Sequence, residues 1–349
     1  MAMKRQLRVG IVGTGKMAKI RAEVMSGIED VTMIAVAHGS PEADRTMRLV
    51  AFARQHGISD LDKWSIGDLE DAGLDALVVC STAETHCDII EEAAKAGVPY
   101  IFCEKPFGVA IPEIDRALIA LDAHDAKLQV GFNRRFDPHF LELHEKVRGA
   151  VRHLEIVSLD PAPPSLENLT QDRALISETM VHDFDTALWF LGDGVDCISV
   201  RESCKNQDLK RAELYQIDAA VALLGFEDGE TCTIRNHWGS PTGYRQEIRI
   251  CDSNYEVWVT NSSDNGTSWL VGVCRMQSAA LHKGFQDRYA ESYVLEILAF
   301  LRSVREGGEI SSGTAEQARQ VAVLVDCARE SAYLHGKSFN PLVQNHVAA

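Results

Sequence analysis

The chain has 349 residues, of which 46% are hydrophobic and 25% charged, values that are ordinary for globular proteins. A chain of this length is expected to form two domains, each with its own core. Its 51 Asp and Glu against 35 Lys and Arg, without a dense basic run, disfavour nucleic-acid binding. An anionic small ligand must therefore be received by a local positive field, such as a helix N-terminus.

The start of the chain and its cysteines bear on the compartment. Residues 1–6 lead directly into a strand-like segment, without the apolar region of a signal peptide, and no stretch reaches the roughly 18 apolar residues of a membrane span. The nine cysteines are scattered and lack CxxC or zinc-like spacing, which suits reduced thiols. We expect a cytoplasmic protein that is not bound to a membrane.

Residues 7 to about 133 alternate short apolar runs with longer amphipathic stretches, which is typical of βαβ units and a parallel sheet. Strands are predicted at 7–12, 31–37, 74–80, 100–103 and 128–132, and helices at about 16–27, 42–56, 84–97 and 111–125. The short connections predict a doubly wound Rossmann domain over residues 1–133.

After about residue 150 strand-like segments follow one another with few helices between them, which favours an α+β domain with a mostly antiparallel, open sheet. These strands are predicted at 151–159, 197–204, 214–225, 231–238, 244–251, 255–260 and 268–274, and helices at about 177–191, 287–306 and 314–335. We expect a domain over residues 134–349 for substrate binding and oligomerisation, with a helix on the inner face of its sheet. Its C-terminal helix can pack back on the first domain.

A glycine-rich turn follows the first predicted strand and opens the first helix, as the GxGxxG/A dinucleotide fingerprint requires. Gly13 permits the tight turn, Gly15 lets the backbone approach a pyrophosphate, and Ala18 allows close packing of helix and strand. The residues predicted to bind the cofactor here are Gly13, Thr14, Gly15, Lys16 and Met17.

The end of the second strand bears on the choice between NAD and NADP. An acidic residue usually stands there to hold the ribose 2′-hydroxyl, but this chain has His38 and Ser40 instead. Ser40 can donate to a 2′-phosphate, and Arg45 or Arg48 can pair with it. The pattern favours NADP(H) or dual use, with His38, Ser40 and Arg45 as cofactor residues; the alternative is that Glu42 contacts the ribose of NAD.

A lysine, Lys105, follows the strand predicted at 100–103, where open α/β sheets bind their ligands. Its ammonium group can hydrogen-bond a reacting oxygen and stabilise charge that develops on it. The alternative is an ordinary solvated surface lysine.

The helix predicted at 177–191 carries Glu178 and His182, four residues apart and so on one face. A histidine oriented by an acid can act as a general base, although it can also be a core or capping residue. A metal site that adds Asp183 and Asp185 is disfavoured, because Asp183 lies on another face and no second histidine has HExxH spacing. A serine hydrolase is disfavoured because the chain lacks a GxSxG motif.

Several motifs, in order along the chain, together resemble the Gfo/Idh/MocA oxidoreductases and, within that family, the inositol dehydrogenases. They are the turn at 13–18, Glu104-Lys105-Pro106, the segments 131–137, 244–247 and 285–289, and the helix with Glu178 and His182. The resemblance therefore covers nearly the whole chain.

The resemblance implies roles for individual residues. Lys105 is the lysine of the family's Glu-Lys-Pro motif, His182 the acid/base, and Glu178 stands at the usual aspartate position with one methylene more. Arg173 and Ala174 replace two glycines that often precede this helix. The substrate pocket would be lined by Asn133, Arg134 and Tyr244, and the nicotinamide end would lie along Ser81, Thr82, His86 and Glu104. The proline-rich segment Asp160–Pro164 is expected to form a loop at the pocket rim; the alternative is a rigid connector.

The implied reaction is NAD(P)-dependent interconversion of a ring secondary alcohol and ketone on a cyclitol, sugar or amino sugar. The alternatives within the family are a ketosugar reductase and a lyase or hydrolase that shuttles hydride on bound NAD. A non-catalytic dinucleotide-binding regulator is the alternative from another class. The resemblance also implies a homodimer or homotetramer formed through the C-terminal sheet, and no metal.

Overall fold

The computed structural model describes residues 5–36, 43–58, 69–147, 151–241, 243–252, 256–260, 267–270 and 284–344. The chain forms two compact units. Unit 1 contains the residues up to Asn133 together with Glu291–Arg319, and unit 2 contains Arg134–Ala290 and the residues from Gln320 onward. The segment 291–319, which was expected within a domain over 134–349, is thus part of unit 1.

Unit 1 is built on a five-stranded parallel sheet with the order β2-β1-β3-β4-β5. The strands are β1 (Leu7–Val12), β2 (Val31–Val36), β3 (Ala76–Val79), β4 (Tyr100–Cys103) and β5 (Lys127–Val130). The order reverses between β1 and β3, and open α/β sheets bind ligands at the carboxyl ends of the strands beside such a point. The doubly wound fold expected from the sequence is confirmed.

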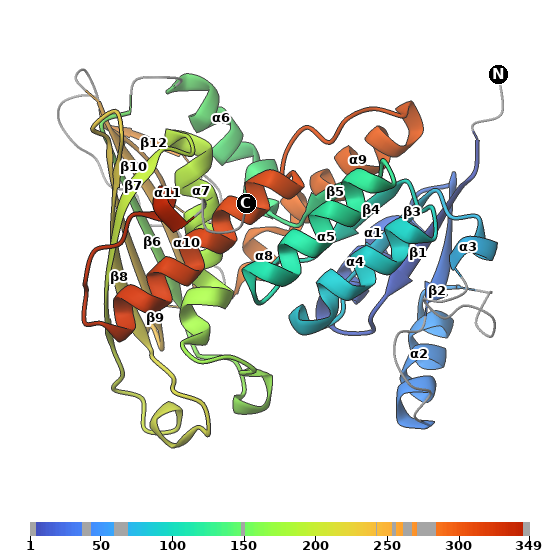
Figure 1. Ribbon diagram of the computed structural model, residues 1–349, viewed down its shortest axis with the longest axis horizontal. Helices are drawn as coiled ribbons and strands as arrows, with labels where there is room; N and C mark the ends of the chain where they lie inside the picture. Colours follow the sequence, from blue (N-terminus) through green and yellow to red (C-terminus); the bar gives the residue numbers. More distant parts are fainter. Residues whose placement is uncertain are drawn as a thin grey trace. The chain divides into compact units, whose positions relative to one another are not determined.

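Helices pack on the sheet of unit 1, with α4 and α5 together over one face (Figure 1). The helices are α1 (Lys16–Ser26), α2 (Ala43–Gln55), α3 (Leu69–Ala72), α4 (His86–Lys95), α5 (Ile111–Ala123) and α9 (Ala290–Glu306), with a 3-10 turn at Ala83–Thr85. The late helix α9 places Phe300 in the core, with its ring 5.6 Å from that of Phe102 on β4. Burial of such aromatic side chains fixes α9 to this unit although it comes so late in the sequence.

Unit 2 is built on a seven-stranded sheet with the order β12-β11-β10-β6-β9-β8-β7, in which only β6 and β9 pair in parallel. The strands are β6 (His153–Asp160), β7 (Val195–Ser203), β8 (Ala219–Phe226), β9 (Thr231–Trp238), β10 (Arg245–Cys251), β11 (Glu256–Thr260) and β12 (Thr267–Leu270). The mostly antiparallel sheet is as predicted, but β8 begins at Ala219 rather than near residue 214.

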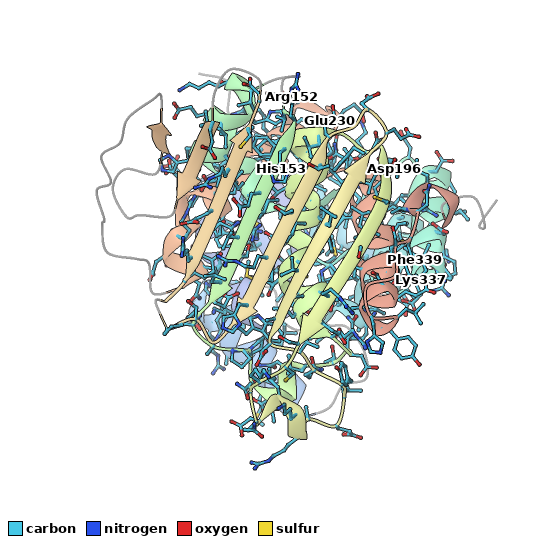
Figure 2. The ribbon with its side chains drawn as sticks, turned by 90° about the vertical axis from the view of Figure 1, so that its left-hand side faces the viewer. Arg152, His153, Asp196, Glu230, Lys337 and Phe339 are labelled. Atoms are coloured by element: carbon cyan, nitrogen blue, oxygen red, sulfur yellow. The ribbon has the colours of Figure 1, made fainter. Side chains whose placement is uncertain are left out.

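The helices of unit 2 lie on one side of this sheet (Figure 1). They are α6 (Pro138–Lys146), α7 (Val181–Leu191), α8 (Phe285–Arg288), α10 (Ala315–Tyr333), which starts in unit 1, and α11 (Pro341–Gln344), with a π-helix at Leu175–Met180 and 3-10 turns at Asn133–Phe136, Leu166–Asn168 and Leu209–Arg211. Figure 2 looks onto the other face, where the side chains of the central strands are uncovered. On β8 the side chains alternate, so that Val221 and Leu223 are exposed while Ala222 and Leu224 are buried.

Two local features differ from the predicted elements. The helix α6 was not predicted, although its start is marked in the sequence: the Asp137 side chain accepts hydrogen bonds from the amides of His139 and Phe140, and Pro138 follows at the first helical position. The helix predicted at 177–191 is instead a π-helix that continues into α7. Among the described residues no helix is both long and apolar enough to cross a membrane.

Candidate active site

The turn between β1 and α1 has the form that a bound pyrophosphate needs. Gly13 has a φ of +104°, and a Cβ there would clash with the backbone carbonyl of Cys80 at the end of β3, so only glycine fits. Around Gly15, in contrast, the space that a Cβ would occupy is open. The first turn of α1 has neither a side-chain cap nor an acidic residue, which leaves its amides and the positive end of the helix dipole for an anion.

Of the residues predicted for a 2′-phosphate, only Arg48 has a described side chain, which is exposed on α2. His38, Ser40 and Glu42 lie outside the described residues, and of Arg45 only the backbone, within α2, is described. The preference for NADP(H) therefore stays a prediction.

The segment after β3 carries Ser81 and Thr82 near the sheet edge, followed by the buried His86. The Nδ1 atom of His86 lies 2.8 Å from the carbonyl oxygen of Pro106, and Nε2 lies 3.2 Å from that of Ser81. Burial lowers the pKa of His86, although both carbonyls act in the opposite direction. A neutral imidazole donates only once, so we assign the proton to Nδ1, which makes the shorter contact.

The segment after β4 carries Glu104, Lys105 and Pro106, with a cis peptide bond before the proline. The amide of Glu104 donates to the carbonyl of Val79 on β3 at 2.9 Å, and Lys105 is half-buried. The predicted residues Gly13, Gly15, Ser81, Thr82, His86, Glu104 and Lys105 thus follow neighbouring strands of one sheet, at the carboxyl ends where ligands bind.

The carboxylate of Glu104, which the resemblance places along the cofactor, belongs to a buried ionic cluster around Arg21 of α1. Arg21 Nε donates to Glu104 at 2.7 Å, and its other nitrogens donate to Glu296 at 2.5 Å and to the carbonyl of Tyr293 at 3.1 Å, both on α9. Burial acts to lower the pKa of Arg21, but Glu104 and Glu296 outweigh it and raise that pKa. Arg21 therefore carries a permanent buried charge.

A second buried ionic cluster lies in unit 2 around Asp183, which directly follows His182 on α7. Asp183 accepts from Arg134, from Ser158 Oγ on β6 at 2.7 Å and from Asn236 Nδ2 on β9 at 2.6 Å. Burial acts to lower the pKa of Arg134, and the nearby Asp183 reverses this and raises it. The carboxylate of Asp183 is thus bound by protein donors on several sides.

The two residues predicted as the catalytic pair, Glu178 and His182, are both half-buried. Glu178 lies in the π-helix and His182 in the first turn of α7, so they are not on one regular α-helix as expected. Single π-turns are frequent at functional sites, because they change which side chains face a pocket. Within this segment Thr179 accepts a hydrogen bond from Trp238 Nε1 of β9 at 3.1 Å.

Tyr244, one of the predicted substrate residues, belongs to an aromatic and cationic cluster that is centred on Tyr289. The rings of Tyr244 and Tyr289 meet edge to face at 6.4 Å, and the guanidinium carbons of Arg134 and Arg288 lie 6.0 and 4.7 Å from the centre of the Tyr289 ring. Burial raises the pKa of the Tyr289 hydroxyl. Sequence reasoning did not assign Tyr289 or Arg288 to the site, and the only signal for them was the family-like segment 285–289.

The remaining predicted substrate residues have local partners. Asn133 is buried and donates from Nδ2 to Ser292 Oγ at 3.1 Å, within unit 1. Asp160, at the end of β6, is half-buried, and its backbone carbonyl accepts from Gly239 and Ser240. Over the part of the chain that the structure describes, no group of three or more His, Cys, Asp or Glu side chains is placed to hold a metal ion.

Comparison with known proteins places both units in one family. A model described as the oxidoreductase family with an NAD-binding Rossmann fold matches residues 7–132, and a model of the GFO/IDH/MocA C-terminal domain matches residues 143–260. An uncharacterized oxidoreductase of Bacillus subtilis (strain 168), YrbE, is 31% identical over 86% of this chain and 87% of its own.

Two further relatives span almost the full chain. An inositol 2-dehydrogenase of Rhizobium meliloti (strain 1021) is 31% identical over 87% of this chain and 91% of its own. A solved structure of a probable dehydrogenase from Thermotoga maritima superposes with a TM-score of 0.82 at 27% identity, over 97% of this chain and 99% of that one. The similarity therefore includes both the glycine turn and the helix that carries His182.

Proposed function

The chain belongs to the Gfo/Idh/MocA oxidoreductases, and from this premise we propose that it oxidises a ring secondary alcohol of an inositol-type cyclitol with NAD(P)⁺, reversibly. The inositol 2-dehydrogenase that aligns with 87% of the chain supports this substrate class. The observation that carries the proposal is the common sheet edge of unit 1, where Lys105 follows β4 and the uncapped N-terminus of α1 follows β1.

The proposed chemistry gives one role to each of the predicted catalytic residues. The Lys105 ammonium hydrogen-bonds the substrate oxygen and polarises the C–O bond, while His182 takes the hydroxyl proton as general base and Glu178 orients the imidazole. A bound nicotinamide ring supplies the hydride acceptor. Loss of a proton to His182 and of a hydride from the carbon converts the alcohol to a ketone, and the reverse steps reduce the ketone.

Cofactor binding is assigned to unit 1. The amides of Gly13, Thr14, Gly15, Lys16 and Met17 would receive the pyrophosphate, and Ser81 and Thr82 would line the nicotinamide end. We propose NADP(H) or dual use, with His38, Ser40 and Arg45 at the ribose. Arg45→Ala should then raise the KM for NADP⁺ at least tenfold, while the KM for NAD⁺ stays unchanged. If the KM for NADP⁺ is the same in Arg45→Ala and in the wild type, the result favours NAD with Glu42 at the ribose.

Substrate binding is assigned to Asn133, Arg134, Asp160 and Tyr244, mostly in unit 2. Arg134 is 3% exposed and bound to Asp183, so we propose that it shapes the pocket by holding neighbouring groups. We propose that Tyr244 contacts the substrate, since its buried ring packs edge to face on Tyr289 beside Arg134 and Arg288.

We also propose a homodimer or homotetramer formed through the uncovered face of the unit 2 sheet (Figure 2). Val221 and Leu223, 51% and 49% exposed, are apolar side chains on that face. Light scattering should find an oligomer that Leu223→Asp dissociates; a monomeric wild-type protein would contradict this. A cytoplasmic location is proposed as well, because no disulfide links the described cysteines.

The direct test is absorbance at about 340 nm with NAD⁺ or NADP⁺ against inositols, hexoses, amino sugars and sugar phosphates. We expect reduction with an inositol, and a loss of about 10²–10⁴-fold in turnover for Lys105→Ala and for His182→Ala. Wild-type turnover in both variants would refute the mechanism. Product without net release of reduced cofactor would instead indicate a hydride-shuttling lyase or hydrolase, reduction of a ketosugar alone would indicate a reductase, and binding without turnover would indicate a regulator.

A further inference from the structure

We propose that Arg21 is a positioning residue for Lys105, acting through the carboxylate of Glu104. The proposal rests on the role of Lys105 given above, and it adds a residue of α1 that neither the family-like motifs nor the glycine fingerprint include. Arg21 does not touch the reacting atoms, because its side chain is fully buried. It acts on the backbone from which Lys105 extends.

Lys105 stands between two residues that are each tied to other parts of unit 1. On one side, Glu104 makes two hydrogen bonds: its amide donates to the Val79 carbonyl at 2.9 Å, and its carboxylate accepts from Arg21 at 2.7 Å. On the other side, the carbonyl of Pro106 accepts from His86 at 2.8 Å. With both neighbours fixed, the Cα of Lys105 has little freedom, and only its side-chain torsions remain to be set.

Arg21 is itself immobilised, as a positioning group must be. Its guanidinium carbon lies 4.7 Å from the centre of the Phe102 ring and 5.1 Å from that of Tyr293, and its nitrogens bind Glu296 and the Tyr293 carbonyl. Because Arg21 belongs to the helix whose first turn is open to a pyrophosphate, it joins the anion-binding end of unit 1 to the segment that carries Lys105. A shift of α1 would therefore be passed to Glu104.

Stability alone does not explain this cluster. Two carboxylates face one guanidinium in a fully buried site, and buried ion pairs are often no more stabilising than apolar side chains of the same size. Geometric precision next to a reacting group is where a planar guanidinium, which donates in several fixed directions, exceeds an apolar residue or a lysine.

The experiment compares Arg21→Met and Arg21→Lys with Met25→Ala, a control one turn further along α1. Met25 is fully buried in the core of unit 1, and its carbonyl accepts from the amides of Gly27 and Ile28 at the end of α1. Its truncation therefore loosens α1 without cutting the link to Glu104. Two readouts need no substrate: hydrogen exchange of the peptide that contains residues 104–108, and the rate at which acetic anhydride labels Lys105 relative to Lys95, both by mass spectrometry.

For Arg21→Met we expect the rates of hydrogen exchange in 104–108 and of Lys105 labelling to rise at least threefold, and for Arg21→Lys we expect a smaller rise. For Met25→Ala we expect no rise, even where its Tm falls as much as that of Arg21→Met. In turnover, kcat should fall about tenfold or more with the KM for the cofactor within threefold, since the turn at Gly13 and Gly15 is intact. Should Arg21→Met fail to fold, Arg21→Lys carries the same test. If the labelling and exchange rates of Arg21→Met match those of Met25→Ala, the proposal is overturned. This test does not depend on the proposed function, because it can be read even if Lys105→Ala proves active.

Discussion

The two buried ionic clusters differ in how many carboxylates surround each guanidinium group. In unit 1, Arg21 faces two carboxylates, Glu104 and Glu296, and is enclosed by aromatic rings. In unit 2, Arg134 faces one carboxylate, Asp183, whose other hydrogen bonds come from neutral side chains. The cluster in unit 1 thus has one carboxylate more than it has guanidinium groups, whereas the cluster in unit 2 pairs one of each.

This difference indicates which residues of each cluster are most important for folding. A one-to-one pair leaves an uncompensated buried charge as soon as either partner is removed. A cluster with a surplus carboxylate can lose one and keep its guanidinium paired. Asp183 should therefore matter more to folding than Glu296, although both are fully buried.

The largest effect is expected at Asp183. Asp183→Ala leaves Arg134 buried without its carboxylate and should lower the free energy of unfolding by about 3–5 kcal/mol in urea titrations. Asp183→Asn, which keeps an acceptor oxygen but no charge, should cost less. A loss below about 1 kcal/mol for Asp183→Ala would show that the pairing in unit 2 is not the tight one described.

The glycine turn should separate folding from binding. Gly13→Ala forces a Cβ against the Cys80 carbonyl at a positive φ and should cost about 1–3 kcal/mol of stability. Gly15→Ala meets open space, so its Tm should equal that of the wild type while NADH, measured by its fluorescence, binds at least tenfold more weakly. Unchanged NADH affinity in Gly15→Ala would show that the pyrophosphate does not bind at this turn.

Glu296 provides the counterpart to Asp183. Glu296→Gln keeps an oxygen acceptor for Arg21, which also retains Glu104, so the free energy of unfolding should fall by about 1 kcal/mol or less. The measurement is the same urea titration as for Asp183→Asn. A larger loss for Glu296→Gln than for Asp183→Asn would reverse the comparison between the two clusters.

A pH dependence of stability should arise from His86. Burial lowers its pKa from 6.5 in the folded protein, so as the pH falls below about 6.5 the unfolded chain takes up a proton that the folded chain does not. Stability should therefore decline on acidification in this window, with a contribution of at most about 1.4 kcal/mol per pH unit. His86→Asn should flatten the slope between pH 6.5 and 5; an unchanged slope would exclude His86 as its source.

Features set by local sequence could be predicted. The strands of unit 1 and its helices α1, α2, α4 and α5 follow from hydrophobic periodicity, and the need for Gly13 follows from the strand-turn-helix motif. Lys105 could be located as well, since it directly follows a predicted strand of the parallel sheet.

Features set by distant contacts could not be predicted. Arg21 finds its partners Glu104 and Glu296 at separations of 83 and 275 residues, and no periodicity reports such a pairing. Asp183 was considered only as a metal ligand, because a helical wheel shows its face but not the donors of β6 and β9 that meet it. The π-turn at Glu178 was missed because hydrophobic spacing in so short a segment fits an α-helix equally well.

Transfer of deuterium tests the central claim most directly. Myo-inositol labelled with deuterium on its ring carbons would be incubated with the protein and oxidised cofactor, and the reduced cofactor analysed by mass spectrometry. We expect one deuterium on the nicotinamide ring and a ketone product, both greatly diminished in Lys105→Ala and His182→Ala. Reduced cofactor without deuterium, or equal transfer in both variants, would contradict it.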